Sequence, residues 1–299
     1  MSMSEIQRDL SAEKIAERPS RIAVVLDYVR RYPLGAAGAM VVLAMLFMAV
    51  FADVIAPYDP EENSFEHMFS PPSLQFLLGT DDFGRDIFSR IIFGSRTALF
   101  VGFVAASVGA TAGLVLGVAS AYFGGWFDLV LQRVMDVFMA FPLIIMALAV
   151  VAVLGTGIDK VIIAITIPFI PMCARVVRSS ALAIREIPYV DAARACGFSH
   201  ARIILRHMVP NVMAPYLIMI TAFVGQAILL EAVLSYLGLG VQEPTAAWGL
   251  MLKSGAEEYA ESAPWIAIFP GVAISLAVFG FNLFGDALRD ALDPKLRMQ

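Results

Sequence analysis

Charged residues are scarce in this sequence. Only 16% of its 299 residues are Asp, Glu, Lys or Arg, whereas about a quarter of the residues in soluble domains are charged. Hydrophobic residues make up 59%. A composition this poor in charge excludes an ordinary soluble domain and is typical of a membrane protein.

Motifs for chemistry are also missing. The sequence contains no G-x-x-x-x-G-K-[ST] motif, and none of its four lysines follows a glycine, so it has no loop that could cradle phosphates. The histidines, His67, His200 and His207, lack the spacing of metal ligands. Ser235 and Ser254 have no histidine predicted at the same depth, which disfavours a membrane-embedded serine protease. We therefore predict no catalytic residue, no metal, no bound cofactor and no nucleic-acid partner.

Long uncharged runs are abundant instead. They cover residues 34–52, 97–127, 137–158, 161–174, 208–230 and 262–285. A bilayer core of roughly 30 Å needs about 20 helical residues, so five of the runs can span it. The fourth is shorter, but its apolar pattern continues past Arg175 and Arg178, whose long side chains can reach the headgroups. The runs lack the alternation of a β-barrel, so we predict an all-α integral membrane protein with six transmembrane helices.

The distribution of Lys and Arg predicts the orientation, because cytoplasmic segments carry the excess. With the N-terminus inside, the inner segments hold 16 of these residues and the outer segments 5. We expect a cytoplasmic N-terminal tail (1–32), a first transmembrane helix (33–56), an extracytoplasmic loop (57–96), a five-helix core (97–285) and a cytoplasmic C-terminal tail (286–299). Cys173 and Cys196 then lie at the inner side, where disulfides are not expected.

The predicted outer loop has two features of its own. Ile87, Ile91 and Ile92 cluster on one helical side, with Asp86 and Arg90 as an (i, i+4) pair on another, which predicts an amphipathic helix along the outer interface. That helix could be a structural support or a contact for an external partner. The outer segments also hold 13 acidic against 5 basic residues, which could steer a basic ligand or serve only solvation.

Within the core, residues 186–211 form a charged loop between the fourth and fifth spans. Pro188 suits a first helical turn, and Gly197 suits a left-handed cap that ends the helix. Ser199 can cap a second helix, and Pro210 opens the next span. Small side chains around Ala192, Ala193 and Cys196 would allow close approach of another protein. The spacing alone leaves two interpretations open, a docking site for a protein or a basic loop held at lipid headgroups.

The stretch "YVDAARACGFSHARIILRHMVPN" resembles the EAA signature of permease subunits of bacterial ABC importers, Glu-Ala-Ala, three residues, Gly, nine residues, Ile-x-Leu-Pro. The residues at matching places are Asp191, Ala192, Ala193, Gly197 and Pro210, with Asp in place of Glu, and with His207 for Ile and Val209 for Leu. Further segments, "LGTDDFGRDIFSRIIFGSR", "MDVFMAFP", "RHMVPN" and "EAVLSYLGLGVQEPTAAWG", are similar to the peptide/nickel branch, the dipeptide or oligopeptide C-type permeases.

The resemblance implies a type I importer permease in the bacterial inner membrane, whose loop acts as a coupling helix on an ATPase subunit. It assigns Asp191 and Arg194 to polar contacts, Ala192 and Ala193 to close packing and Gly197 to the turn, with Arg202 and Pro210 in the same coupling segment. The implied partners are a second permease, two ABC ATPase subunits that hydrolyse ATP, a solute-binding protein and lipid. Dipeptides, longer peptides, glutathione-like compounds and nickel complexes all fit as substrates.

Glu231 is the notable acid inside a predicted span, near its outer end, and intramembrane acids are functional candidates. We weigh a structural or gating role against direct substrate binding, and a simple position at the headgroups is a further alternative. An ion-coupled secondary carrier is the alternative function, but such a carrier would normally show several buried acids. A membrane enzyme is the third class.

Overall fold

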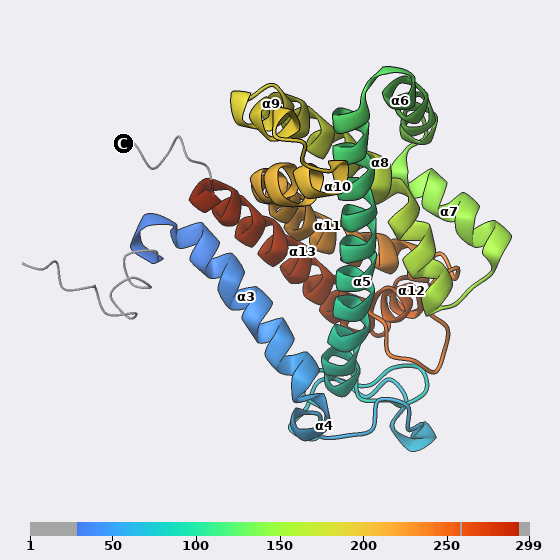
Figure 1. The fold of residues 1–299 in the computed structure, drawn as a ribbon. Helices are drawn as coiled ribbons and strands as arrows, with labels where there is room; N and C mark the ends of the chain where they lie inside the picture. Colours follow the sequence, from blue (N-terminus) through green and yellow to red (C-terminus); the bar gives the residue numbers. More distant parts are fainter. Residues whose placement is uncertain (1–28, 258, 293–299) are drawn as a thin grey trace, which may run out of the picture.

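The computed structural model describes residues 29–257 and 259–292. Most of the predicted N-terminal tail (1–28) and residues 293–299 lie outside this description. The longer helices are α3 (Pro33–Val50), α5 (Ile87–Phe123), α6 (Gly125–Met139), α7 (Leu143–Leu154), α8 (Ile158–Arg185), α11 (Met213–Tyr236), α12 (Trp248–Glu257) and α13 (Trp265–Leu292). The shorter ones are α4 (Ala52–Ile55), η1 (Phe65–His67), α9 (Pro188–Ala195), α10 (His200–Ile203), η2 (Ile204–Met208) and η3 (Val209–Val212). Figure 1 shows these helices as one bundle with a looped region at one end.

Five stretches are long and apolar enough to cross a membrane, namely α3, α5, α8, His200–Tyr236 and α13. The helices α6 and α7 pass the same test only as a pair, and they are bent by 88° against each other. With 12 residues, α7 is about 18 Å long, well short of a hydrocarbon core of roughly 30 Å. The six predicted spans are therefore present only if α6 and α7 together count as one. The break lies at residues 140–142, where the extended backbone of Pro142 precedes α7.

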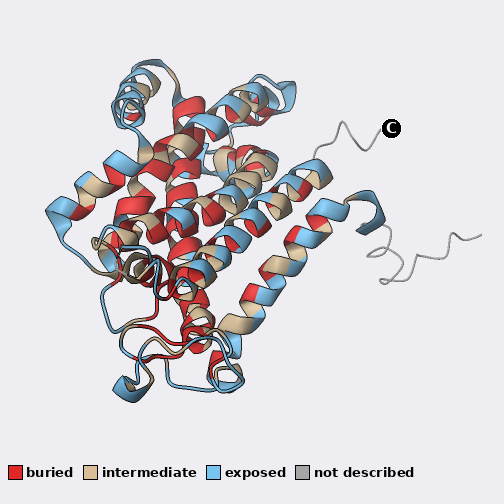
Figure 2. Ribbon diagram, turned by 180° about the vertical axis from the view of Figure 1, so that it is seen from behind, coloured by how far each residue is buried: buried red, intermediate tan, exposed pale blue. Residues whose placement is uncertain are grey.

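Close packing of α5 against α8 forms the centre of the bundle. Gly109, Gly113 and Gly117 of α5 face α8 at four-residue spacing, and a Cβ added at Gly113 would lie 2.6 Å from the Cβ of Cys173. Small residues at this spacing let two membrane helices approach closely. Figure 2 shows buried residues concentrated in the central helices and exposed residues along the outer faces.

The outer faces of the bundle carry large apolar side chains. On α3, Leu34, Met40 and Leu43 are more than 60% exposed, and on α13 Ile268 and Phe279 are more than 50% exposed. A soluble protein rarely exposes so much contiguous apolar surface. This pattern agrees with helices that face lipid.

The start of α5 differs from the sequence-based expectation. The predicted amphipathic helix is not a separate element on the surface, because α5 runs without interruption from Ile87 through the second span. Asp86 and Arg90 do not pair with each other: Asp86 caps the helix by accepting from the Ser89 N–H at 2.8 Å. Arg90 is fully buried. A cap is the favoured role of an Asp directly before a helix, and that role orients Asp86 away from Arg90.

The ends of the described chain share one end of the bundle. The first turn of α3 packs against the last turns of α13, where Gly35 lies against Ala287. Figure 1 shows this end on the same side as α9, whereas α4 and the 57–86 loop lie at the opposite end. The helix α13 continues seven residues past Gly285, to Leu292.

Candidate functional site

The segment between α8 and α11, residues 186–212, folds into a helical hairpin at one end of the bundle (Figure 1). Pro188 stands in the first turn of α9, where its missing N–H leaves no bond unmade. Ser199 caps the second helix by accepting from the Arg202 N–H at 3.4 Å. After α10 the chain passes through a π-turn and a 3-10 turn that contains Pro210. We call residues 186–212 the hairpin below.

Gly197 forms the bend of the hairpin. Its φ is +74°, a left-handed conformation that glycine adopts without the penalty paid by residues with a Cβ. Its N–H donates to the Arg194 carbonyl at 2.9 Å, and the Phe198 N–H donates to the Ala193 carbonyl at 3.2 Å. These bonds satisfy carbonyls at the end of α9. No neighbouring atom lies within 4 Å of a Cβ built at Gly197, so backbone conformation alone requires glycine there.

The hairpin has one face buried in the bundle and one face open. The buried face consists of Val190, Ala193, Ile203, Met208 and Val212. Ala193 therefore packs inside the chain, and the expectation that it contacts a partner together with Ala192 is wrong for Ala193, which is 6% exposed. The open face carries most of the predicted coupling residues: Asp191, Ala192, Arg194, Gly197, Arg202 and Pro210.

Hydrogen bonds close the base of the hairpin. The Tyr189 hydroxyl at the start of α9 donates to the His207 carbonyl at 2.9 Å. The Asn211 amide donates to that same carbonyl at 2.7 Å and to the Tyr189 hydroxyl at 2.9 Å. These bonds join the two arms, so α9 is tied to the segment that leads to α11.

A second contact joins the hairpin to α5. The Tyr122 hydroxyl, near the end of α5, lies 2.7 Å from Nδ1 of His200. The Arg194 guanidinium carbon lies 5.2 Å from the centre of the Tyr122 ring, within cation–π range. Nearby, Arg185 at the end of α8 donates to the Ala121 carbonyl at 2.8 Å. Sequence reasoning missed Tyr122, because no local pattern relates it to His200, 78 residues later.

The charged residues on the open face form only weak ion pairs within the chain. Asp191 and Arg194 pair with each other at 3.2 Å, and their side chains are 68% and 39% exposed. Exposed pairs of this kind contribute about 0–1 kcal/mol, so either charge can exchange its partner at little cost. The Arg202 guanidinium lies 4.2 Å from the Phe198 ring centre. The open face can therefore offer charged and small side chains to another surface.

Glu231 lies inside the bundle, far from the hairpin. Its side chain is 1% exposed, so the alternative in which it meets lipid headgroups is wrong. The Ser235 hydroxyl donates to Oε1 of Glu231 at 2.7 Å and accepts from the Val241 N–H at 3.1 Å. The chain Glu231–Ser235–Val241 ties the end of α11 to the loop that follows it.

At the opposite end of the bundle, two buried arginines form an ionic cluster that sequence reasoning missed. Arg85 contacts Asp81 at 2.7 Å and Glu243 at 2.6 Å. Arg90 lies 3.7 Å from Asp81 and 3.6 Å from Glu243, and it donates to the Pro60 carbonyl at 2.8 Å. Burial alone would lower the pKa of Arg85, but its hydrogen bond to Glu243 and the charge of Asp81 outweigh burial and raise it. The cluster joins the 57–86 loop, the start of α5 and the loop before α12.

In the part of the chain that the structure describes, no three His, Cys, Asp or Glu side chains lie where they could hold a metal ion. Cys196 is exposed and Cys173 is buried.

Comparison with known proteins connects these features to a class of membrane proteins. The profile of the "binding-protein-dependent transport system inner membrane component" family matches residues 113–298. The profile "N-terminal TM domain of oligopeptide transport permease C" matches residues 20–72. In fold, the chain resembles inward-facing structures of the MetNI methionine ABC transporter, with a TM-score of 0.56 and 18% identity over 69% of this chain and 98% of that one.

Relatives of known class match over most of their length. A putative peptide transport system permease protein of Brucella abortus is 46% identical over 86% of this chain and 88% of the relative. The dipeptide transport system permease protein DppC of Alkalihalophilus pseudofirmus is 41% identical, and the glutathione transport system permease protein GsiD of Escherichia coli is 43% identical; each match covers 90% of this chain and 88% of the relative.

The bundle of apolar helices and these matches define a membrane permease of an ABC importer. The chain belongs to the binding-protein-dependent transport system inner membrane component family. This family is one of transport permeases and not of enzymes, and it favours the importer over the ion-coupled carrier. The family's name gives the cellular location, the inner membrane, and implies a binding protein as a partner.

Proposed function

We propose that the hairpin is the place where this chain receives motion from an ABC ATPase, and that the chain forms half of a pathway for peptides or related small solutes. The observation that carries the proposal is that the hairpin has one open face and one face buried in the bundle. An open face of small and charged residues is backed by buried residues that tie it to α5, α8 and α11. A push on the open face would therefore reach three spans.

The proposed assembly contains this chain, a second similar permease, two ATPase subunits on the side of the hairpin and a solute-binding protein on the side of the 57–86 loop. The hairpin and both chain termini are cytoplasmic in this arrangement, as the excess of Lys and Arg in the inner segments favours. The ATPase subunits bind and hydrolyse ATP. This chain contributes no cofactor site. Its contact with the ATPase is made or shaped by Asp191, Ala192, Arg194, Gly197, Arg202 and Pro210.

The coupling is a shift between conformations. ATP can bias the permease only if the ATP-bound ATPase pair binds one hairpin position better than another. Closure of the ATPase pair would move the hairpin, the shared hydrogen bonds would carry that movement to α5, α8 and α11, and the pathway would open to the outside. Glu231 would keep the end of α11 fixed to its loop during this movement, which is a structural role in gating.

Peptides are the substrate class that the names of the relatives favour, since those relatives include peptide, dipeptide and glutathione permeases. In such systems a binding protein delivers the solute, so the choice among dipeptides, longer peptides, glutathione-like compounds and nickel complexes depends on that partner. Identification of the ligand that copurifies with the cognate binding protein would decide among them.

The experiment that tests the proposal is ATP-driven uptake by proteoliposomes that contain the complete assembly, with the variant Gly197→Val. A β-branched residue at φ +74° is strained, so the bend should distort and uptake should fall at least about tenfold, which corresponds to a loss of about 1.4 kcal/mol of coupling free energy. The matched control is Gly155→Val, because Gly155 also has positive φ (+88°) and open space but lies between α7 and α8.

Gly155→Val should retain uptake, and both variants should insert into the membrane. Equal uptake by Gly197→Val and the wild type, with ATP hydrolysis unchanged, would contradict the coupling role. Uptake that persists without ATP and stops when ion gradients are collapsed would instead support the secondary carrier.

A further inference from the structure

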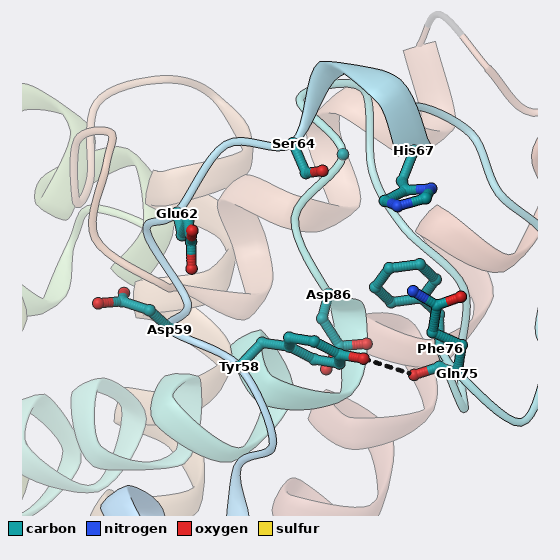
Figure 3. Close-up of a pocket in the computed structure, with 9 residues that line it drawn as sticks. Tyr58, Asp59, Glu62, Ser64, His67, Gln75, Phe76 and Asp86 are labelled. Carbon is teal, nitrogen blue, oxygen red and sulfur yellow. Dashed lines mark hydrogen bonds between the residues drawn. The ribbon is translucent and has the colours of Figure 1, made fainter.

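A second feature lies at the end of the bundle opposite the hairpin, in the 57–86 loop. This loop encloses a pocket of about 200 Å³ between the segment around Tyr58 and the segment around Phe76 (Figure 3). Two rings that pack against each other line it, with the Tyr58 and Phe76 ring centres 5.3 Å apart. The Tyr58 hydroxyl is held in place because it donates to the Gln75 carbonyl at 3.2 Å.

Three of the other lining residues are acidic. Asp59 and Glu62 are exposed lining residues, and Asp86 also lines the pocket. His67 lies against Phe76, with the ring centres 5.2 Å apart, and no Lys or Arg lines the pocket. The exposed surface of the loop has the same sign, because it carries Asp59, Glu61, Glu62 and Glu66, whereas the other acids are buried, partly buried or, like Asp53, paired with an arginine.

Asp86 provides an independent indication of a ligand. Its side chain is 3% exposed. Its Oδ2 accepts from the Ser89 N–H and hydroxyl at 2.8 and 2.7 Å, whereas its Oδ1 has no hydrogen-bond partner. A buried carboxylate oxygen without a donor is costly. Asp86 lines the pocket, and Figure 3 shows its carboxylate beside Tyr58, so a donor that enters the pocket would approach it.

We propose that this pocket binds the cationic side chain of a lysine or arginine presented by a protein partner on this face. The negative charges require a cation, and the described residues have no grouping that could hold a metal ion. The rings of Tyr58 and Phe76 suit the apolar stem and the charged head of such a side chain. At about 200 Å³, the pocket is smaller than the roughly 300–1,000 Å³ of sites that enclose whole small molecules.

The surface around the pocket supports a macromolecular partner. The exposed acids Asp59, Glu61, Glu62 and Glu66 would attract a basic patch of another protein toward the loop. The inference rests on the proposed function only in that the 57–86 loop faces the side where a binding protein docks. Binding to the pocket can be measured on this chain alone, without ATP or an ATPase.

The test is hydrogen–deuterium exchange of the full chain in lipid nanodiscs, with a blocked peptide, acetyl-Gly-Gly-Lys-Gly-Gly-amide, as the probe. The peptide should slow exchange in residues 57–86, whereas the same peptide with norleucine in place of Lys should not. This neutral peptide separates pocket binding from occupation of a transport pathway. Added salt should weaken the protection, because the pairing is between charges near solvent.

Variants of the acidic residues test whether the peptide binds in the pocket. The double variant Asp59→Asn/Glu62→Gln should raise the apparent Kd for the Lys peptide about tenfold, because charged hydrogen bonds are lost. Asp86→Asn should weaken binding as well, while Asn preserves the helix cap. The matched control is Glu61→Gln/Glu66→Gln, which removes two exposed acids of the same loop that do not line the pocket, and the apparent Kd should rise much less than in Asp59→Asn/Glu62→Gln.

Two results would overturn the proposal. One is the absence of protection by the Lys peptide, or protection that the double variant does not weaken. The other is protection by n-pentylammonium chloride together with none by the Lys peptide, which would make the pocket a site for free amines. Either result would leave the coupling role of the hairpin standing, and failure of the Gly197→Val experiment would leave the pocket proposal standing.

Discussion

Gly197 and Arg90 are held in place by contacts of very different range along the chain. Gly197, Pro188 and Ser199 have local roles, fixed by the backbone conformation of one turn, and each has the conformation or cap that the sequence predicts. Arg90 has partners 30 and 154 residues away in the chain. Arg90 follows Asp86 by four positions, the same spacing as in an exposed (i, i+4) ion pair, so the sequence did not predict that Arg90 is buried.

Ser235 tests the structural role of Glu231. Ser235→Ala removes the hydroxyl that donates to Glu231, and a buried acceptor without its donor costs about 1–3 kcal/mol. We expect a lower thermal unfolding temperature of the purified assembly in detergent. The control is Ser275→Ala, because the Ser275 hydroxyl is exposed and bonds only to the Gly271 carbonyl of its own helix. Equal unfolding temperatures for both variants would contradict a buried link at Glu231.

Asp82 gives the 57–86 loop a predicted pH dependence. Burial raises the pKa of the Asp82 carboxyl, and the neighbouring charge of Asp81 raises it further. Because the folded-state pKa lies above the unfolded value of about 3.9, protonated Asp82 favours the folded loop, and this contribution is lost as the pH rises through the folded-state pKa. Asp82→Asn should therefore stabilise the protein at neutral pH by up to about 1 kcal/mol.

The stabilisation by Asp82→Asn should disappear at a pH below the unfolded-state pKa, because residue 82 is then neutral in both the wild type and the variant. Thermal unfolding measured across the pH range would show the two curves converge in acid. The variant Glu66→Gln, which removes an exposed charge of the same loop, is the control. A constant difference between Asp82→Asn and the wild type at every pH would contradict the predicted linkage.

Among the elements, the hairpin was the most predictable and the third span the least. The hairpin is bounded by Gly, Ser and Pro signals whose chemistry is local, so its place between two spans followed from the sequence. The division of its residues between an open and a buried face did not, since Ala192 and Ala193 are chemically alike and only packing separates them. The third span looks continuous in hydropathy, yet residues 140–142 break it and leave α6 as a helix bent away from α7.

Tyr122 tests whether the hairpin acts through α5. Tyr122→Phe keeps the ring beside Arg194 and removes only the hydroxyl at 2.7 Å from His200. A hydrogen bond of this kind contributes about 0.5–1.5 kcal/mol, so we expect several-fold less solute transported per ATP hydrolysed. The matched control is Tyr216→Phe, which removes a hydroxyl at 2.8 Å from Thr111 of α5 outside the hairpin. Equal coupling ratios in the two variants would contradict transmission through Tyr122.

At the scale of the whole molecule, composition and uninterrupted apolar runs were enough to predict a helical membrane protein. The sequence did not predict which helix packs against which. The spacing of the glycines in α5 shows that another helix can approach closely, but it does not identify α8 as that helix. The two ends of the bundle differ in character. One carries the hairpin and the ends of α3 and α13, and the other carries the acidic 57–86 loop and the cluster around Arg90 (Figure 1).

The most direct test of the central claim uses the chain's own cysteines. Cys196 is exposed beside Gly197 and Cys173 is buried, so a thiol-directed bifunctional reagent attaches at the hairpin, and Cys196→Ser is the control. In the assembled transporter we expect a cross-link from Cys196 to an ATPase subunit whose yield changes when ATP binds. A cross-link only to the extracytoplasmic binding protein, or no cross-link to an ATPase subunit with or without ATP, would contradict the account.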